Sequence, residues 1–284
     1  MMSCGPDGDG RWADFHLHSS RSDGSDSPAR VACRAAGAGM AALALTDHDT
    51  VLGVEEARAG AEAAGIAFLT GVEISASLDR REVHVVGLGI DCRSEPLLGL
   101  LSGLRAGRRE RSGRMLRLLA NAGISLELPE TPDEGPGSFT GRMHIAAALH
   151  ARGVTRSVQD GFDRFLKPGR PAWVPKTLVP VEEAVNAIHG ASGLAFLAHP
   201  GLGSGFGRML PLLLSLPFDG IEAFHVSHTP RQTGEFLAVA RERGLLVSGG
   251  SDCHGTIKGR APEMGRVKVP WEWAAPLVER LAMG

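Results

Sequence analysis

Histidine recurs in five short clusters along this 284-residue chain, and four of them also contain a carboxylate. The clusters are His16-Leu17-His18 with Asp23, Asp47-His48-Asp49, Glu73 with His84, His199 after the apolar run LAFLA, and Asp252-Cys253-His254. Neutral imidazole and carboxylate oxygen are ligands of zinc, manganese and iron in proteins. One such pair would be weak evidence, whereas five clusters with the same arrangement, a strand followed by a ligand, indicate a multinuclear metal site.

Each cluster also has a simpler interpretation. The HLH sequence on its own is a pattern that often arises by chance. Asp47 and Asp49 could orient imidazoles or cap the following helix. Glu73 lies in an apolar run, where burying an unpaired carboxylate is costly, so either a metal or a salt-bridge partner must be near it. His84 could be a hydrogen-bonded core histidine. Taken together, the clusters favour metal binding.

Composition restricts the class of protein. The formal net charge is −2, from 30 basic and 32 acidic residues, so we expect no overall attraction to nucleic acid and no extended duplex as a ligand. The four cysteines form no CxxC pair, which favours a reducing compartment. No apolar run is long enough to span a membrane. We expect a cytoplasmic protein without membrane contact or an obligate protein partner.

Short apolar runs alternate with segments of helical length. The predicted strands are residues 13–16, 42–46, 67–74, 83–90, 194–198, 220–224 and 245–248. The predicted helices are residues 28–38, 54–64, 180–191, 208–215 and 230–243, three of which begin with proline. This alternation predicts a parallel sheet covered by helices, and the number of strands suggests a closed or nearly closed α/β barrel.

Many of the candidate residues fall at, or just past, the C-terminal end of a predicted strand. These residues are His16, His48, Glu73, His199, His225 and Asp252. In a βα barrel, the loops at that end converge on one basin. The sequence therefore predicts that residues far apart along the chain meet there.

Residues 95–170 interrupt the alternation with an Arg-rich helical segment, a Pro/Gly-rich stretch and two further helical segments. We interpret them as a helical insertion between two parts of the barrel, residues 1–94 and 171–284. The insertion could cap the basin as a lid that excludes water and selects substrate. Alternatively, it could simply enlarge the fold.

Several sequences, in this order, resemble the polymerase-and-histidinol-phosphatase (PHP) family of metallophosphoesterases: HLHSSRSDGSDSP, TDHDT, GVEIS, VHVVGLG, LAHP, IEAFHVSH and SDCHG. The resemblance covers residues 13–265. The middle sequences GRMHIAAALHARGV and FDRFLKPGRPAWVP are similar to the branch that removes phosphate from nucleotides and to related 5′-to-3′ exonucleases. The resemblance to the PHP family implies a distorted (β/α)7 barrel that holds up to three divalent metals, Mn, Fe or Zn, at its C-terminal face.

The resemblance also implies a ligand set. His16, His18, Glu73 and Asp252 resemble the first metal site. Glu73, His84 and His199 resemble the second, with Glu73 bridging, and Asp23, His48 and His254 resemble the third. The branch often has Tyr-His where Phe224-His225 stands here, so a tyrosine contact to substrate is not expected.

The implied activity is hydrolysis of a nucleotide phosphomonoester, with AMP, 3′,5′-bisphosphate nucleotides or short oligonucleotides as substrates, by metal-activated hydroxide. Arg21 could hold a phosphate, and His225 and His228 could protonate the leaving oxygen or contact phosphate. Arg142, His144 and Lys176 could reach a second phosphate or the base. The alternatives are a histidinol-phosphate phosphatase and a non-catalytic, metal-dependent nucleotide-binding domain.

Overall fold

The computed structural model describes residues 10–128, 141–202, 206–257 and 262–281. Within these ranges, seven longer strands form one sheet: β1 (Trp12–Asp14), β2 (Ala42–Leu45), β3 (Ala67–Leu78), β4 (Arg81–Leu88), β6 (Leu194–Leu197), β7 (Gly220–His225) and β8 (Leu246–Gly250). Two short strands, β5 (Val179–Pro180) and β9 (Val269–Pro270), pair with β3 and β1. The spatial order is β8-β7-β6-β4-β3-β2-β1-β9.

The sheet curls into a nearly closed barrel, because its first and last long strands meet. The backbone N–H of Phe15 donates to the carbonyl of Gly249 at 3.0 Å. Just beyond the strand ends, the N–H of Asp252 donates to the carbonyl of His16 at 3.0 Å, and Leu17 bridges to Cys253 in parallel. The predicted distorted seven-stranded α/β barrel is therefore confirmed.

The alternation of strands and helices predicted a parallel sheet, but the sheet is mixed. Strand β4 runs antiparallel to both of its neighbours, β3 and β6. Only Asp79 and Arg80 separate β3 from β4, and both have positive φ values, 48° and 64°. A two-residue turn of this kind produces a β-hairpin, since a parallel crossover needs a dozen or more residues.

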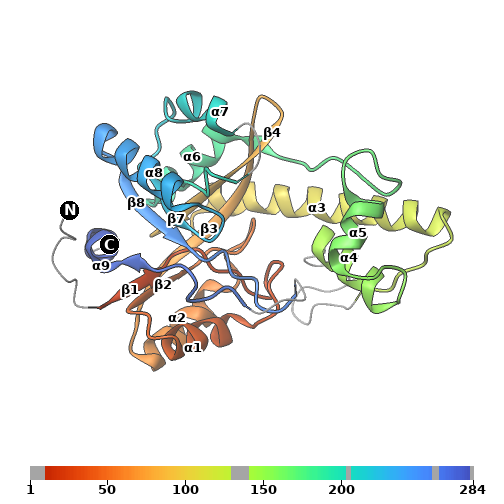
Figure 1. Cartoon of the computed structure of the whole chain (residues 1–284), viewed down its shortest axis with the longest axis horizontal. Coiled ribbons are helices and arrows are strands. Elements are labelled where there is room, and N and C mark those ends of the chain that lie inside the picture. The colour runs from red at the N-terminus through yellow and green to blue at the C-terminus, as the bar shows by residue number, and fades with distance from the viewer. Residues whose placement is uncertain (1–9, 129–140, 203–205, 258–261, 282–284) are drawn as a thin grey trace.

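Helices surround the barrel on two sides: α1 (Pro28–Gly37), α2 (Val54–Ala64), α6 (Val181–Gly190), α7 (Phe206–Leu213) and α8 (Pro230–Arg243). Figure 1 shows α1 and α2 together on one side and α6, α7 and α8 on the other. The sequence marks their ends well. Ser27 caps α1 directly before Pro28, and α8 begins with a Thr229–Gln232 capping box and ends at Gly244, whose φ is 66°.

The end of the barrel away from the candidate ligands is apolar. Helix α9 (Trp271–Leu281), which the sequence analysis did not predict, packs there. Its Leu277 belongs to the same buried cluster as Phe15 and Phe196 of the barrel interior. Leu194, which begins β6, and Leu88, which ends the antiparallel β4, lie in this cluster as well. The buried interior at this end of the barrel is therefore apolar, and the candidate ligands lie at the opposite end.

One long helix connects the barrel to the inserted segment. Helix α3 (Glu95–Asn121) places Leu97, Leu101 and Leu104 in the barrel's main buried cluster. Further along, its Met115 and Leu119 pack in a second cluster with α4 (Arg142–Ala151) and the π-helix Phe162–Leu166, which follows α5 (Val158–Gly161). Figure 1 shows α3 running out of the barrel toward α4 and α5. None of the helices described is both long and apolar enough to cross a membrane.

Candidate metal centre

All nine predicted metal ligands lie at one end of the barrel, where their donor atoms form overlapping groups. Within each group, the donor atoms lie within 4.8 Å of one another. The groups are His16-His18-Asp252, His16-Glu73-His199, His48-Glu73-His84 and His18-Asp23-His48-His254. Because the groups share members, they make one continuous cluster.

Glu73 occupies the centre of this cluster, and its two oxygens face different histidines. Its Oε2 lies 3.3 Å from His16 Nε2, 3.3 Å from His18 Nε2 and 2.9 Å from His48 Nδ1. Its Oε1 lies 2.7 Å from His84 Nδ1 and 3.0 Å from His199 Nε2. This division agrees with a carboxylate that bridges two metal positions.

The position of Glu73 along its strand differs from the prediction. It was placed at a strand end, but β3 continues to Leu78, so Glu73 lies in the middle of the strand. The reason is the hairpin: β3 and β4 extend together past the barrel rim and carry Glu73 and His84 toward the other ligands. His84 pairs with Ser75 in the cross-strand register, two residues beyond Glu73.

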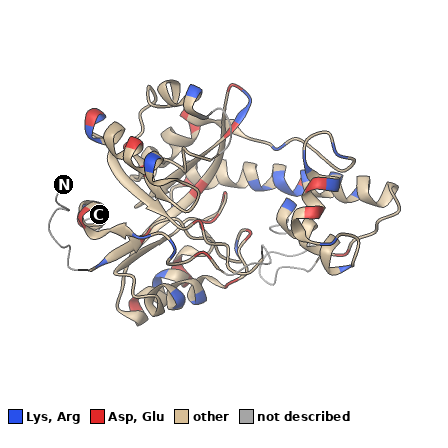
Figure 2. Ribbon diagram, viewed as in Figure 1, with Lys and Arg blue, Asp and Glu red and all other residues tan. Residues whose placement is uncertain are grey.

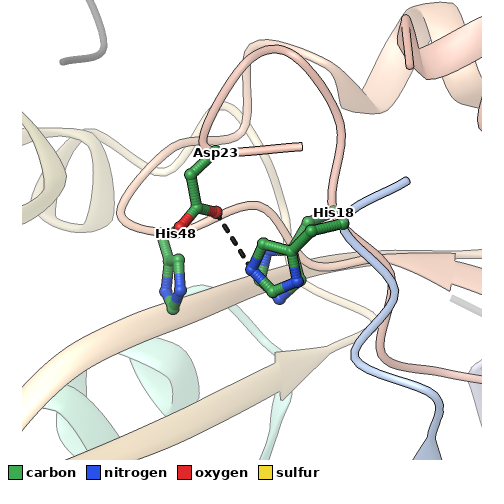
Figure 3. Close-up of side chains that lie close together, drawn as sticks. His18, Asp23 and His48 are labelled. Atoms are coloured by element: carbon green, nitrogen blue, oxygen red, sulfur yellow. Dashed lines mark ion pairs between the residues drawn. The ribbon is translucent and has the colours of Figure 1, made fainter. Parts of the chain in front are cut away.

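A third group is built from three separate loops. His254 Nε2 lies 3.2 Å from Asp23 Oδ1, and the His18 and His254 rings stack with centroids 4.2 Å apart. The centroid of the His48 ring lies 4.6 Å from that of His18. Figure 3 shows His18, Asp23 and His48 pointing toward one another. The fold therefore brings the HLH sequence and the aspartate that follows it next to His48 of the distant TDHDT sequence.

Buried aspartates next to the ligands hold the loops in place. Asp47 accepts hydrogen bonds from the Ser19 backbone N–H (2.7 Å), the Ser19 hydroxyl (2.6 Å) and the Ser22 hydroxyl (2.5 Å), which fixes the loop that carries Asp23. Asp49 accepts from the Ser75 N–H and hydroxyl and pairs with Arg108 of α3. Among the described residues, neither aspartate hydrogen-bonds to an imidazole or caps a helix, the two roles considered from the sequence.

The carboxylates of the cluster are ionised. Burial raises the pKa of Glu73, but His48, His84 and His16 outweigh it and hold that pKa well below its usual range. Burial opposes ionisation of Asp23 and Asp252 in the same way, and neighbouring imidazoles, chiefly that of His254, lower both pKa values well below the usual range. Buried anions surrounded by imidazoles form a donor set suited to cations.

Several candidate ligand atoms in the cluster make no hydrogen bond of suitable geometry within the described part of the chain. His16 Nε2, His48 Nδ1 and Glu73 Oε2 are buried and lie close together, but none of them makes a hydrogen bond of suitable geometry to a described residue. A buried polar atom without a partner costs free energy that a bound cation would recover. The residues therefore fit divalent metals, although the nitrogen and oxygen donors do not distinguish Mn, Fe and Zn.

The three residues predicted to be catalytic lie in different surroundings. His225 is buried, with Nε2 3.8 Å from Asp252 Oδ2 and Nδ1 2.7 Å from the Ser227 hydroxyl. Both ring nitrogens of His228 contact the backbone, at Ala223 O (2.9 Å) and Gly201 N (3.1 Å), which favours a positioning role over catalysis. Arg21 Nη2 pairs with Glu56 Oε2 at 3.1 Å.

A cavity of about 140 Å³ connects the cluster to the inserted helices. Its lining includes Asp23, His48, His84 and four cationic residues, Arg108, Arg111, Arg142 and Lys176. Arg142, one of the predicted substrate contacts, also lies 5.9 Å from the Phe162 ring centroid. Lys176, another, lies 2.5 Å from Glu82 Oε1. His144, the third, accepts a hydrogen bond from the Gly141 N–H, and burial lowers its pKa.

Sequence reasoning missed Arg108, which pairs with Asp49, and Glu222, whose carboxylate contacts His16 Nδ1 and accepts the His199 backbone N–H. Arg108 belongs to an Arg-rich helix, and nothing in the local pattern separates it from neighbouring arginines. Figure 2 shows Lys and Arg following the part of α3 that runs toward α4 and α5. Glu222 is a carboxylate inside the apolar run GIEAF, the same signal that identified Glu73. It could therefore have been found.

A barrel that gathers nine imidazole and carboxylate residues at one end defines a metal-dependent barrel enzyme. Residues 14–131 match the family model of the PHP domain. The 3′,5′-nucleoside bisphosphate phosphatase of Chromobacterium violaceum is 39% identical over 257 residues, 87% of this chain and 88% of that protein. The 5′-3′ exoribonuclease of Haemophilus influenzae is 34% identical over 245 residues, 85% of this chain and 89% of that protein.

A solved structure agrees with these relatives. The structure of a protein from Bifidobacterium adolescentis, described as a metal-dependent phosphoesterase, matches with a TM-score of 0.82 at 29% identity, covering 96% of this chain and 98% of that one. The chain belongs to the PHP family. It is a metal-dependent phosphoesterase and therefore a hydrolase.

Proposed function

We propose that this enzyme hydrolyses a phosphomonoester of nucleotides that carry a second phosphate, such as 3′,5′-bisphosphate nucleotides. The observation that carries the proposal is the cavity shared by candidate metal ligands and cationic side chains. The metal centre accounts for one phosphate. The cations on the other side of the same cavity need a second anion.

The charges within the cavity support this second anion. Lys176 and Arg108 are balanced by Glu82 and Asp49. In contrast, no ion pair joins Arg111 or Arg142 to a carboxylate among the residues that the structure describes. Burial and, next to it, the charge of Arg142 together lower the pKa of Arg111 to about 10. Two like charges in a confined space favour binding of an anion such as phosphate.

In this proposal, three divalent ions, Mn, Fe or Zn, bind the nine residues in the sets implied by the family resemblance. Such ions lower the pKa of water toward neutrality and neutralise phosphate charge. His225 faces the cluster through Nε2, which is buried and has no hydrogen-bond partner among the described residues. Its Nδ1 is held by Ser227, so the ring is oriented to protonate a leaving oxygen. A cytoplasmic location stays a prediction.

Steady-state kinetics on Arg142→Ala test the proposal. A charge-assisted hydrogen bond contributes roughly 1.5–3 kcal/mol, so KM for a 3′,5′-bisphosphate nucleotide should rise by about tenfold or more while KM for AMP changes little. Arg164→Ala is a matched control, because Arg164 also packs on a phenylalanine ring, at 4.9 Å from the Phe165 centroid, but does not line the cavity.

Other outcomes would identify the alternatives. An equal rise in KM for both substrates would show that Arg142 does not contact a second phosphate. The same assay should include short 5′-phosphorylated RNA and histidinol phosphate. Fast turnover of histidinol phosphate with none of the nucleotides would refute nucleotide specificity. A correctly metallated protein that turns over none of them would favour a non-catalytic binding domain.

A further inference from the structure

We propose that Glu222 is a positioning residue for the metal centre, which orients the His16 ring and holds the His199 backbone. The inference depends on the metal centre proposed above and not on the identity of the substrate. Glu222 lies within β7 and is fully buried. Its Oε1 lies 2.9 Å from His16 Nδ1, and its Oε2 accepts the backbone N–H of His199 at 2.7 Å.

The first contact selects which nitrogen of His16 is available to a metal. A carboxylate can only accept hydrogen bonds, so Nδ1 of His16 must carry the proton. The lone pair is then left on Nε2. That nitrogen lies 3.3 Å from Glu73 Oε2 and 3.7 Å from Asp252 Oδ1, on the side of the ring that faces the cluster. Carboxylates in this role commonly fix the tautomer and the ring orientation of metal-binding histidines.

The second contact stabilises an unusual backbone conformation. His199 has a φ of 28°, a positive value that non-glycine residues seldom adopt. This conformation aims the side chain at the cluster, with Nε2 3.0 Å from Glu73 Oε1. Without an acceptor for its N–H, the His199 backbone would lose a buried hydrogen bond and its fixed direction.

Glu222 and Glu73 contact the same two residues, His16 and His199, from different sides. His16 faces Oε2 of Glu73 and His199 faces Oε1, so Glu222 supports one ligand on each side of the central carboxylate. Glu222 is absent from the groups of residues that could hold an ion directly. Since both of its oxygens accept hydrogen bonds from ligand residues, it acts through them.

The test is a Mn²⁺ titration of chelator-treated full-length protein by isothermal titration calorimetry, comparing the parent with Glu222→Gln. An amide offers one acceptor and one donor group, so it can satisfy His16 or the His199 N–H but not both. We expect binding at the sites that include His16 and His199 to weaken by about 10- to 100-fold. The equivalent held by Asp23, His48 and His254 should keep its affinity.

Asp219→Asn is a matched control. Asp219 directly precedes β7 and accepts an equivalent pair of groups, the Ala195 backbone N–H at 2.8 Å and His189 Nε2 at 2.7 Å, but neither belongs to the metal cluster. This control should bind Mn²⁺ like the parent. Equal weakening in both variants would overturn the proposal, because it would indicate a general effect of perturbing β7.

Parent-like affinities in Glu222→Gln would also overturn the proposal. Far-UV circular dichroism and melting of the chelator-treated protein establish whether each variant is folded. If the Gln variant does not fold, Glu222→Asp decides instead. Its shorter side chain withdraws the carboxylate by about 1.5 Å, so it must weaken the same sites, and unchanged affinity would refute the positioning role.

Discussion

Replacing Glu73 by glutamine should remove more than one metal equivalent. The carboxylate belongs to two of the donor groups, and its oxygens face five imidazoles at 2.7–3.3 Å. Glutamine has nearly the same shape but no charge. The groups that lack Glu73, namely His16-His18-Asp252 and His18-Asp23-His48-His254, keep their members. Because the two groups share His18, we expect metal content to fall from three equivalents toward one.

The loss can be expressed as stability. A ligand at 100 times its dissociation constant stabilises the folded state by about 2.7 kcal/mol, so losing two such sites removes about 5 kcal/mol of metal-dependent stability. For a chain of this size, each kcal/mol shifts Tm by roughly 2 °C, giving a metal-induced shift about 10 °C smaller than the parent's. The chelator-treated variant should itself melt below the chelator-treated parent, because imidazoles whose pKa Glu73 raises lose their buried charge partner, so each metal-induced shift is measured from that protein's own chelator-treated value.

Elemental analysis and thermal melting with and without Mn²⁺ provide both quantities. Glu56→Gln is a suitable control, since Glu56 pairs with Arg21 outside the cluster. Retention of all three equivalents, or loss of only one, would refute the assignment of Glu73 as a shared ligand.

Two further predictions concern individual ligands. Asp23→Ala should lose the third metal and retain the other two, because Asp23 belongs to one donor group only; elemental analysis that finds unchanged content would show that Asp23 only shapes its loop. The second prediction concerns pH. Although burial lowers the pKa of His84, Glu73 and Glu82 outweigh it and raise the pKa to about 9. Metal requires the neutral ring and competes with that proton, so apparent Mn²⁺ affinity should rise by about tenfold per pH unit up to about pH 9 and then level off. Titrations at pH values on both sides of 9 test this, and the same pH profile in His84→Ala as in the parent would show that His84 is not a ligand.

The part of the site that the sequence predicted best consists of ligands that follow a strand directly. His16, His48 and His199 each come after a short apolar run, and parallel strands bring such positions to the same rim. At these positions, the residue type and the barrel topology both predict a place in the metal cluster. Glu73 was identified for a different reason, the cost of burying a carboxylate, and its exact place along β3 was missed.

The remaining features depend on distant contacts. The reversed direction of β4 follows from the two-residue turn at Asp79 and Arg80, a short-range signal that the overall alternation of strands and helices concealed. Arg108 is selected from its helix only because α3 passes next to Asp49. The burial of α9 against the barrel end likewise depends on tertiary packing. Its apolar residues follow an ordinary helical pattern, which does not indicate where the helix packs.

The course of helix α3 limits how modular this protein can be. The helix is roughly 40 Å long and contributes to two hydrophobic cores, with Leu97, Leu101 and Leu104 in one and Met115 and Leu119 in the other. Excising the inserted segment at its first residue would therefore strip three leucines from the barrel. A minimal barrel must keep the first three turns of α3, and any graft of a different insertion onto this scaffold should be joined after Leu104.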